Sequence, residues 1–521
     1  MENSEHNLDE VETSTETVCE GAEKCAKKEN AFFKLVGFSK AKNTTVKTEF
    51  IAGIVTFLAM AYILTVNPNQ ILYAGTADGR WSSLFMATAF GAIIGTLLMA
   101  FLAKMPLAQA SGMGLNSLLG GVIGGGVGSF AYEFNFTIGQ GFMMVLISGI
   151  IFALLSLIQI KGKTFRELVF DGMPVAIRSA ISVGIGLFIA YIGFQNAKVI
   201  VSNEYTQIAL VDFTNWSSGL PQQAVVALVG LFLIAILDKL NVKGSVIIGI
   251  LGAAIIGIPM GVTQLSVLSG GNGVSWKFWN NFANFFSVGE NSVFGSFTSV
   301  FSTGFPAGSL FTVIMIIMTM CMIDMFDTMG TIVGCCGGNR ILSDENDKPH
   351  NYGKIMISDS IATCTGAMLG TSTVTTFVES GAGVSAGGRT GLTALTTACM
   401  FFLALFIMPV FAAIPSAAAA SALIYVGVLM MKNNVKNIDF KNAINATAAF
   451  LTIAVMVLSY SITKGIGIGM VSYTLMSIFA YLVELVKYAI TKKEKPVWDV
   501  SVVAIVVTVL FVVYFFVPTV L

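Results

Sequence analysis

Two carboxyl groups follow an apolar stretch of the sequence at a spacing that would bring them onto one face of a helix. Asp324 and Asp327 come directly after the apolar run 310–323, and Thr328 follows them. Residues three apart are neighbours on a helix surface. A charged side chain at the centre of a membrane helix costs about 2.5–3.5 kcal/mol, so we expect this pair to face the protein interior. For Asp327 a second interpretation stays open, in which it caps the helix at the cytoplasmic interface.

A third carboxyl group, that of Glu379, stands where a Thr-rich stretch gives way to glycines. Residues 371–376 favour extended backbone because β-branched side chains are enriched in strands. Non-helical backbone at membrane depth survives only inside protein or along a polar cavity, since unpaired N–H and C=O groups are costly in lipid. We therefore expect a short strand and then a half-helix, with Glu379 at the junction, as in transporter substrate sites. The alternative is a cytoplasmic loop that joins two helices.

A second interrupted segment provides a counterpart for the first. Residues 109–117 are polar and interrupted by glycine, and they contain Gly112, Gly114 and Asn116. Two interrupted segments at corresponding positions of a transporter indicate a binding site between them. Asn116 either binds a substrate there or satisfies exposed backbone groups. Asp359, which lies in a further apolar run, is expected to be a structural partner of backbone N–H groups.

The composition places the chain in the membrane. Of its 521 residues, 55% are hydrophobic and 11% are charged, and the mean hydropathy is +0.80. A soluble domain has about 25% charged residues. We therefore expect the lipid bilayer, and not a nucleic acid, as a partner. Residues 1–23 are acidic and lack Lys and Arg, so they are not a secretory signal and are expected to form a disordered tail.

Long apolar runs predict fourteen membrane segments. They lie near residues 49–67, 81–103, 111–128, 138–160, 173–194, 221–238 and 243–263, and then 307–326, 352–370, 376–388, 391–411, 414–432, 442–461 and 464–488. Most Lys and Arg fall in the N-terminal tail and the even-numbered loops, and the odd-numbered loops hold only Arg80, Lys198, Lys277 and Lys464. Because short cytoplasmic loops are enriched in basic residues, we place the N-terminus in the cytoplasm. We expect the protein to lie in the plasma membrane. The apolar run 497–519 either crosses once more or lies against the bundle.

The order of the segments predicts an inverted repeat, because seven segments and a linker bring the second half into the membrane from the opposite side. Pro174 leads into the fifth segment as Pro415 leads into the twelfth. We predict an all-α polytopic membrane protein with a 7+7 repeat and short strands in segments 3 and 10. Its predicted divisions are a cytoplasmic tail 1–48, a first repeat 49–263, a linker 264–306, a second repeat 307–490 and a C-terminal apolar segment 491–521.

Several of these motifs together resemble the AzgA-like purine permeases, a branch of the second nucleobase-cation symporter family related to the xanthine and uracil permeases. The resemblance covers roughly residues 32–490 and rests on the stretches 56–64, 66–68, 112–116, 324–328, 370–373, 379–380 and 387–393. It implies a core domain of segments 1–4 and 8–11 and a gate domain of segments 5–7 and 12–14. The acidic tail and the pair Phe377-Val378 depart from the family's pattern, and the second leaves the preferred base open.

The resemblance also implies which residues bind the substrate. In that family the base lies between the strands of the third and tenth segments and is held by acids of the eighth and tenth. Carried over to this sequence, these two roles fall on Asp324 and Glu379. The implied site is completed by the lining residues Gly112, Gly114 and Asn116 and by the adjacent candidates Asp327, Thr328 and Ser380.

We therefore expect a secondary transporter that takes up purine bases with protons, hypoxanthine and guanine first, with adenine and xanthine as further candidates. A desolvated carboxylate accepts the N–H and amino donors of a purine with charge-assisted strength. Burial without a cationic partner favours the protonated carboxyl, so Asp324 and Glu379 are also expected to couple the proton. We expect no cofactor and no metal, and a homodimer stays open.

Two other functions compete with this expectation. An anion exchanger or channel of the same fold would prefer a positive or neutral site between half-helix ends, whereas acids dominate here. A membrane-embedded enzyme would need a nucleophile with a base, or a set of metal ligands, at lipid depth. Both histidines, His6 and His350, lie in stretches expected to be exposed. We therefore do not expect an enzyme.

Overall fold

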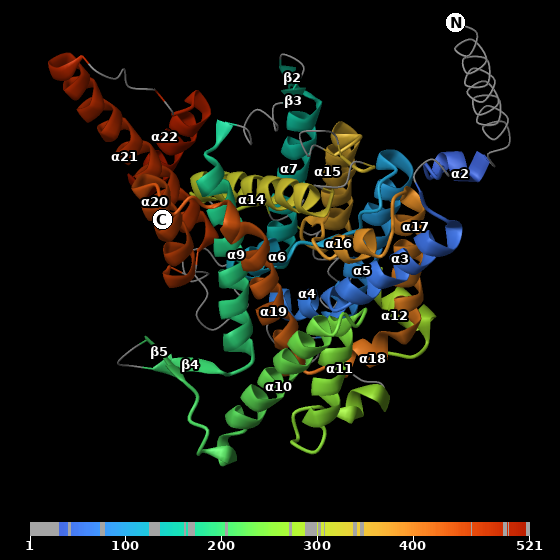
Figure 1. Ribbon diagram of the computed structural model, residues 1–521. Helices are drawn as coiled ribbons and strands as arrows, with labels where there is room; N and C mark the ends of the chain where they lie inside the picture. Colours follow the sequence, from blue (N-terminus) through green and yellow to red (C-terminus); the bar gives the residue numbers. More distant parts are fainter. Residues whose placement is uncertain are drawn as a thin grey trace, which may run out of the picture.

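The protein is a bundle of helices with short strands at its centre and at its periphery (Figure 1). The computed structural model describes residues 31–39, 43–72, 79–123, 136–160, 163–164, 172–203, 207–269, 274–286, 300, 304–306, 308–336, 341–343, 349–459, 461–492, 498 and 500–516. The acidic stretch 1–23, with His6, and a large part of the predicted linker lie outside the described residues.

The helices follow the predicted apolar runs closely. Those of the first half are α2 (Ala31–Leu35), α3 (Val46–Met60), α4 (Ile63–Leu72), α5 (Trp81–Leu98), α6 (Met113–Val122), α7 (Ile138–Leu157), α9 (Val175–Asn196), α10 (Leu220–Lys239) and α11 (Ser245–Gly257). Those that follow are α12 (Phe278–Phe285), α14 (Leu310–Cys336), α15 (Tyr352–Leu369), α16 (Ser380–Ser385), α17 (Gly391–Ala404), α18 (Met408–Ala412), α19 (Ser416–Asn434), α20 (Ala443–Leu458), α21 (Ile462–Thr491) and α22 (Val502–Phe516).

Within the described residues, nine helical stretches are long and apolar enough to cross a bilayer. They are Val46–Leu72, Trp81–Ala103, Ile138–Leu157, Val175–Asn196, Leu220–Lys239, Leu310–Met329, Gly391–Ala412, Ser416–Asn437 and Lys464–Ile490. Four shorter helices are also apolar, namely Met113–Val122, Ser245–Gly257, Ala443–Leu458 and Val502–Val513. The chain is therefore an all-helical polytopic membrane protein in its main architecture, as predicted.

Three antiparallel strand pairs complete the described structure. The hairpins β2 (Gln159–Ile160) with β3 (Lys163–Thr164) and β4 (Ile200–Asn203) with β5 (Gln207–Leu210) are local. The third pair, β1 (Gln109–Ser111) with β6 (Val374–Thr376), joins the two halves of the chain, and both strands are buried. The predicted strands in the third and tenth segments are thus confirmed, and the interpretation of the glycine-rich stretch as a loop is wrong.

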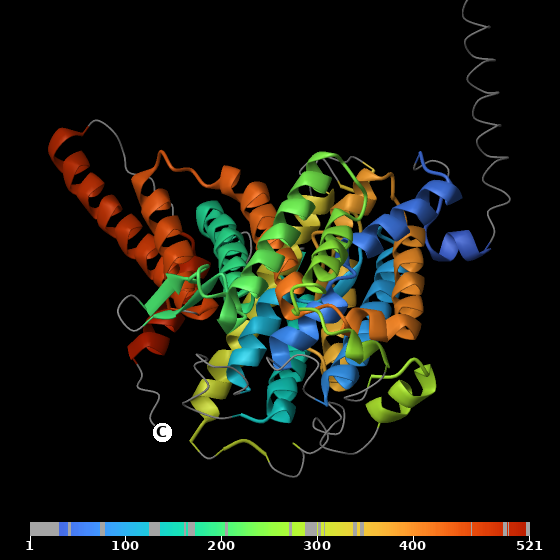
Figure 2. The same ribbon diagram turned by 90° about the horizontal axis from the view of Figure 1, so that it is seen from below.

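The helices pack in two groups. In one group α9, α10, α11, α19, α20 and α21 contact each other, and in the other α3, α4, α5, α7, α14, α15, α16 and α17 do so. The two groups meet where α14 and α6 contact α9, where α19 contacts α4, and where α11 contacts α3. In both views the C-terminal helices α20–α22 lie at one edge of the bundle and α3 with α17 at the opposite edge (Figures 1 and 2).

Helices α9 and α19 cross closely because each carries a glycine at the contact. A Cβ atom on Gly186 would lie 2.7 Å from Cβ of Met430, and one on Gly427 would lie 2.5 Å from the carbonyl oxygen of Gly186. Both helices begin after a proline N-cap, Pro174 in one and Pro415 in the other. The sequence similarity between the fifth and twelfth segments therefore corresponds to a pair of helices that begin alike and pack together.

Some element boundaries differ from the prediction. The first segment is not one helix, because α3 ends at Met60 and α4 begins at Ile63 after a turn that contains Tyr62. The second part of the predicted tail is packed: Phe38 is buried, and the carbonyl oxygen of Val36 accepts from the N–H of Gly391 at 3.0 Å. The predicted linker contains α12, whose aromatic residues pack against Phe90 of α5. The C-terminal apolar run forms α22, which packs on α21.

Candidate functional site

The strand pair β1–β6 fixes the centre of the candidate site. Its ladder continues at both ends. At one end the N–H of Gly112 donates to the carbonyl oxygen of Thr373 at 2.9 Å, and at the other the N–H of Phe377 donates to the carbonyl oxygen of Ala108 at 3.0 Å. Half-helix α6 follows β1, and half-helix α16 follows β6. Because the strands are antiparallel, the two half-helices leave the pair at opposite ends, as expected for two interrupted segments that face each other.

Residue 112, where the chain passes from β1 to α6, has little room for a side chain. A Cβ atom there would lie 2.7 Å from Cγ2 of Thr375 on the facing strand. Gly114 has different surroundings, where an added Cβ atom would lie 3.3 Å from Cγ2 of Ile185 on α9 and 3.7 Å from Cδ1 of Ile462 on α21. Gly112 therefore lies between the strands, whereas Gly114 lies at the contact between the two helix groups.

A network of amide and hydroxyl groups surrounds Asn116. Its Oδ1 accepts from Oγ of Ser111 at 3.0 Å and from the hydroxyl of Ser372, and its Nδ2 donates to Oε1 of Gln70 at 3.3 Å. Nearby, Nδ2 of Asn67 donates to the hydroxyl of Thr371 at 2.9 Å. Asn116 is fully buried and, in this conformation, bonds mainly to side chains that join α4, β1 and the residues before β6.

Asp359 and Thr328 tie helices to the strand pair. Asp359 accepts from Nε2 of Gln109 at 3.0 Å and from the hydroxyl of Thr328 at 2.9 Å. Thr328 also lies 2.6 Å from the hydroxyl of Thr375. Asp359 is a structural partner as predicted, but these partners are side chains and not backbone N–H groups. Thr328, predicted to adjoin the substrate, is engaged in the same network.

Asp324 lies beside the start of β6. Its Oδ2 accepts from the hydroxyl of Thr363 at 3.3 Å, and the same hydroxyl is 3.2 Å from the carbonyl oxygen of Val374. Asp324 is fully buried, in the middle of the 27-residue helix α14. The expectation that this carboxyl group faces the protein interior is therefore confirmed.

Glu379 lies at the other end of β6, immediately before α16, with 7% of its surface exposed. Its Oε1 accepts from the hydroxyl of Tyr62, which lies in the turn between α3 and α4. Its Oε2 is buried and has no hydrogen-bond partner among the described residues. An acceptor oxygen that is shielded from water and unused is costly, which makes it a candidate to receive a donor from a ligand.

Asp327 is the second acid of this part of the site. It is half-buried, and it lies close enough to Glu379 for the two carboxyl groups to interact electrostatically. Helix α14 continues to Cys336, so Asp327 is well inside the helix. The interpretation of Asp327 as a cap at the helix end is therefore wrong. The structure brings it together with Glu379, whereas Asp324 lies by the opposite end of the strand.

Ser380 joins the two interrupted segments. Its hydroxyl accepts from the backbone N–H of Ala108 at 3.0 Å. Tyr62, Gln70 and Thr363 each bond to a predicted site residue, but their roles were not predicted from the sequence. The same holds for Gln109, which bonds to Asp359. For Tyr62 and Gln70 the available signal was a polar side chain in an apolar run, but this signal does not indicate the partner. Within the described residues, no group of three or more His, Cys, Asp and Glu side chains lies together as metal ligands would.

The fold is that of a known class of membrane transporters. The transmembrane domain of a cyanobacterial bicarbonate transporter, BicA, superimposes with a TM-score of 0.55, 16% sequence identity, and coverage of 81% of this chain and 97% of that chain. At this identity the likeness concerns the fold alone.

The sequence then identifies the family. The model of the Permease family, of the xanthine and uracil permease type, matches residues 47–468. The guanine/hypoxanthine permease PbuO of Bacillus subtilis is 35% identical over 444 residues, which cover 84% of this chain and 93% of that protein. The adenine permease AdeP of Escherichia coli is 34% identical over 436 residues, which cover 84% of this chain and 88% of that protein. The chain belongs to this family of multi-pass membrane permeases, and the resemblance to AzgA-like permeases is confirmed. It is a transporter and not an enzyme.

Proposed function

We propose that the protein transports purine nucleobases, with hypoxanthine and guanine as the first candidates and adenine and xanthine as further ones. The similar permeases PbuO and AdeP are named for guanine and hypoxanthine and for adenine. The observation that carries the proposal is the carboxylate of Glu379, which keeps one buried oxygen unused beside Asp327 and Tyr62. A purine offers ring N–H and amino donors to such an acceptor, and a hydrogen bond to a charged group is worth about 1.5–3 kcal/mol.

The site we propose lies along β6 and the facing α14. Glu379 and Asp324 would hold the base from the two ends of the strand, Asp327 would adjoin Glu379, and Gly112 would keep the floor between the strands open. Asn116 and Thr328 would position the walls through their bonds to neighbouring side chains, and Ser380 would fix α16 against β1. Gly114 would lie where the two helix groups close over the base.

We propose the proton as the coupling ion, carried by Glu379 or Asp324. Two carboxylates that are close together and shielded from water repel each other. Glu379 is buried and Asp327 is half-buried near it, so a proton that binds with the substrate would relieve the repulsion between the two carboxylates. Uptake into vesicles with an inward proton gradient in Na⁺-free buffer, compared with a Na⁺ gradient at constant pH, tests this assignment. Accumulation driven by Na⁺ alone would contradict it.

We further propose that fourteen of the segments form a 7+7 inverted repeat in the plasma membrane, with the N-terminus in the cytoplasm. The group of α3–α7 with α14–α18 would be the core domain and the group of α9–α11 with α19–α21 the gate domain. The separate packing of the two groups supports this division. Transport would then proceed by movement of the core past the gate, which exposes the site to one side at a time.

Counterflow in proteoliposomes tests the function itself. Vesicles that contain the full chain and are loaded with unlabelled hypoxanthine should accumulate labelled hypoxanthine transiently, and vesicles loaded with buffer should not. An anion exchanger of the same fold would instead show counterflow of sulfate or bicarbonate and none of purines. The Glu379→Gln variant serves as the site control, because it keeps the shape of the side chain and removes the charged acceptor.

A further inference from the structure

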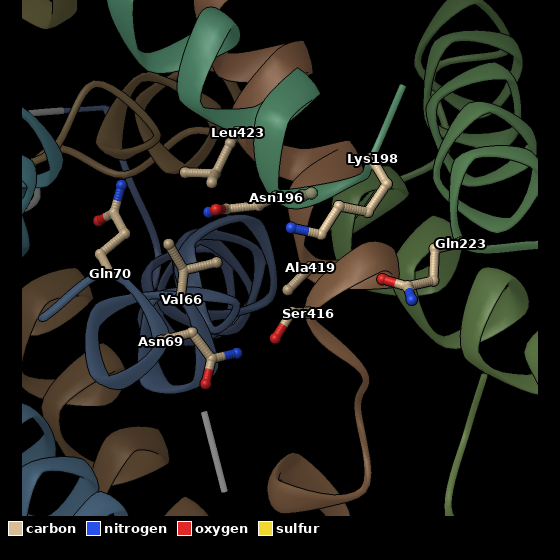
Figure 3. Close-up of a pocket in the computed structure, with 10 residues that line it drawn as sticks. Val66, Asn69, Gln70, Asn196, Lys198, Gln223, Ser416, Ala419 and Leu423 are labelled. Atoms are coloured by element: carbon tan, nitrogen blue, oxygen red, sulfur yellow. The ribbon is translucent and has the colours of Figure 1, made fainter. Parts of the chain in front are cut away.

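A polar pocket of about 210 Å³ lies between the two helix groups, away from the strand pair. Its walls come from α4, from the end of α9 and the residues after it, and from the first turns of α10 and α19 (Figure 3). These ends lie on the side of the membrane that we propose to be outside the cell. The volume exceeds the roughly 30 Å³ of one water molecule several times and is below the roughly 300–1,000 Å³ of pockets for drug-sized ligands. It has room for one small molecule.

Lys198 supplies the charge of this pocket. It follows the C-cap of α9, Ala197, in a left-handed conformation with φ of 57°, so the chain turns sharply there. Lys198 is exposed overall, and in the close-up its amine lies beside Asn196 at the pocket (Figure 3). None of the described residues that line the pocket is acidic. Lys198 is therefore the one charged side chain among the described residues that line the pocket.

Other groups in the wall also act as donors. Oδ1 of Asn69 accepts from Nε1 of Trp81 at 2.8 Å, which leaves the Nδ2 group to face the pocket (Figure 3). Ser416 opens α19, and the N-cap of that helix, Pro415, makes no side-chain cap bond. Together with Ala419, Ala420 and Leu423, Ser416 lines the pocket along one face of this helix. The pocket would favour a ligand edge made of acceptors.

Gln70 forms the wall between this pocket and the strand site. Its Nε2 donates to the hydroxyl of Ser117 at 3.1 Å, and its Oε1 accepts from Nδ2 of Asn116 at 3.3 Å. Both ends of the amide are thus engaged toward α6, while the residue lines the pocket on its other side. One buried side chain separates the pocket from the network around Asn116. A ligand in the pocket would stand directly before the proposed transport site.

We propose that this pocket is an outer binding site for 6-oxopurines, which would enter it before they reach the strand site. The proposal rests on the proposed function and names the substrate class that the pocket selects. Guanine and hypoxanthine carry adjacent acceptors at O6 and N7, the edge that lysine and arginine recognise. Adenine has an amino donor in place of O6, which would meet the donors of Lys198 and the Asn69 amide where a 6-oxopurine presents an acceptor. The outer pocket binds the acceptor edge, and the acids of the strand site are left to bind donors.

Initial rates of labelled hypoxanthine uptake in proteoliposomes test the proposal on the full chain. For Lys198→Met we expect the KM of hypoxanthine to rise roughly five- to tenfold, as for loss of one charge-assisted hydrogen bond at a partly exposed site. The maximal rate should stay within about twofold, and inhibition by adenine should be unchanged, because the strand site is intact. Lys198→Arg should keep the wild-type KM, since a guanidinium also binds O6 and N7.

Lys277→Met is the matched control, since Lys277 is an exposed lysine of the same predicted outer side that does not line the pocket. An unchanged KM in Lys198→Met would overturn the proposal, as would an equal loss of hypoxanthine and adenine affinity. Failure of the proposed function gives a different result, because the wild-type protein would then show neither purine uptake nor purine counterflow.

Discussion

At the scale of single residues, the function proposed here depends on Glu379 and on how its two oxygens are used. Tyr62 donates to one, and the other is buried and has no partner in the described part of the chain. The position of this acid could be predicted from the sequence, since a carboxyl group between a Thr-rich stretch and glycines stands out. The contact of Tyr62 with Glu379 could not be predicted, because 317 residues separate the two. Nothing in the apolar run around Tyr62 indicates the turn in which it lies.

Glu379→Gln should abolish accumulation of purine bases. The amide keeps the size of the side chain, but it replaces the charged acceptor and cannot carry a proton. Uptake of labelled hypoxanthine by cells that express the variant, with the amount of protein in the membrane measured by immunoblotting, checks this expectation. Glu484→Gln, on the exposed part of α21, should transport as the wild type does. Wild-type accumulation by Glu379→Gln would remove this residue from the site.

Asp327→Asn should lose uptake as fully as Asp324→Asn. The sequence allowed a milder effect, because Asp327 could have been a helix cap, but α14 runs on to Cys336 and the charge of Asp327 is within reach of Glu379. Uptake assays on both variants at equal membrane abundance make the comparison. Residual uptake in Asp327→Asn alone would return this residue to a structural role.

At the scale of elements, the site depends on two strands that no ordinary membrane helix could replace. Thr-rich sequence and glycines were sufficient to predict β6 and the half-helix after it. The register could not be predicted, because the pairing of Gln109 with Thr376 is a contact between distant parts of the chain. For the same reason the packing of α12 on Phe90 was missed, since a Gly- and Asn-rich stretch shows no helical periodicity that would indicate its partner.

Gly112→Ala should weaken the strand pair. The added Cβ would lie 2.7 Å from Cγ2 of Thr375, and overpacking of this kind costs about 1–3 kcal/mol. We expect a lower midpoint of thermal unfolding for the purified protein and slower uptake. Gly121→Ala is the matched control on the same half-helix, where an added Cβ meets nothing within 4 Å. Equal unfolding midpoints for the two variants would show that the strands tolerate the extra atom.

At the scale of the whole molecule, transport should require that the two helix groups move past each other. A Cβ atom at Gly244, which caps α11 with φ of 78°, would lie 3.1 Å from Cβ of Leu58 on α3. This separation is shorter than the roughly 3.5–4.5 Å of a disulfide, so the turn at Gly244 must shift slightly for the bond to form. The pair Leu58→Cys with Gly244→Cys, once oxidised, should stop uptake and leave hypoxanthine binding in place. A reducing agent should restore uptake, and each single variant should transport throughout. Undiminished uptake by the fully crosslinked protein would contradict movement between these groups.

The pairing of β1 with β6 has a consequence for the synthesis of the protein. The two strands are separated by up to 267 residues, so β1 leaves the ribosome long before its partner exists. At about 5–20 residues per second, the wait is on the order of tens of seconds. During that time the segment 109–122 has too little helix to satisfy its own backbone in lipid. The insertion machinery, or a temporary partner among the helices already made, must keep the polar backbone groups of this segment out of lipid until the second half is synthesised. The centre of the site is therefore among the last parts of the chain to reach its final environment.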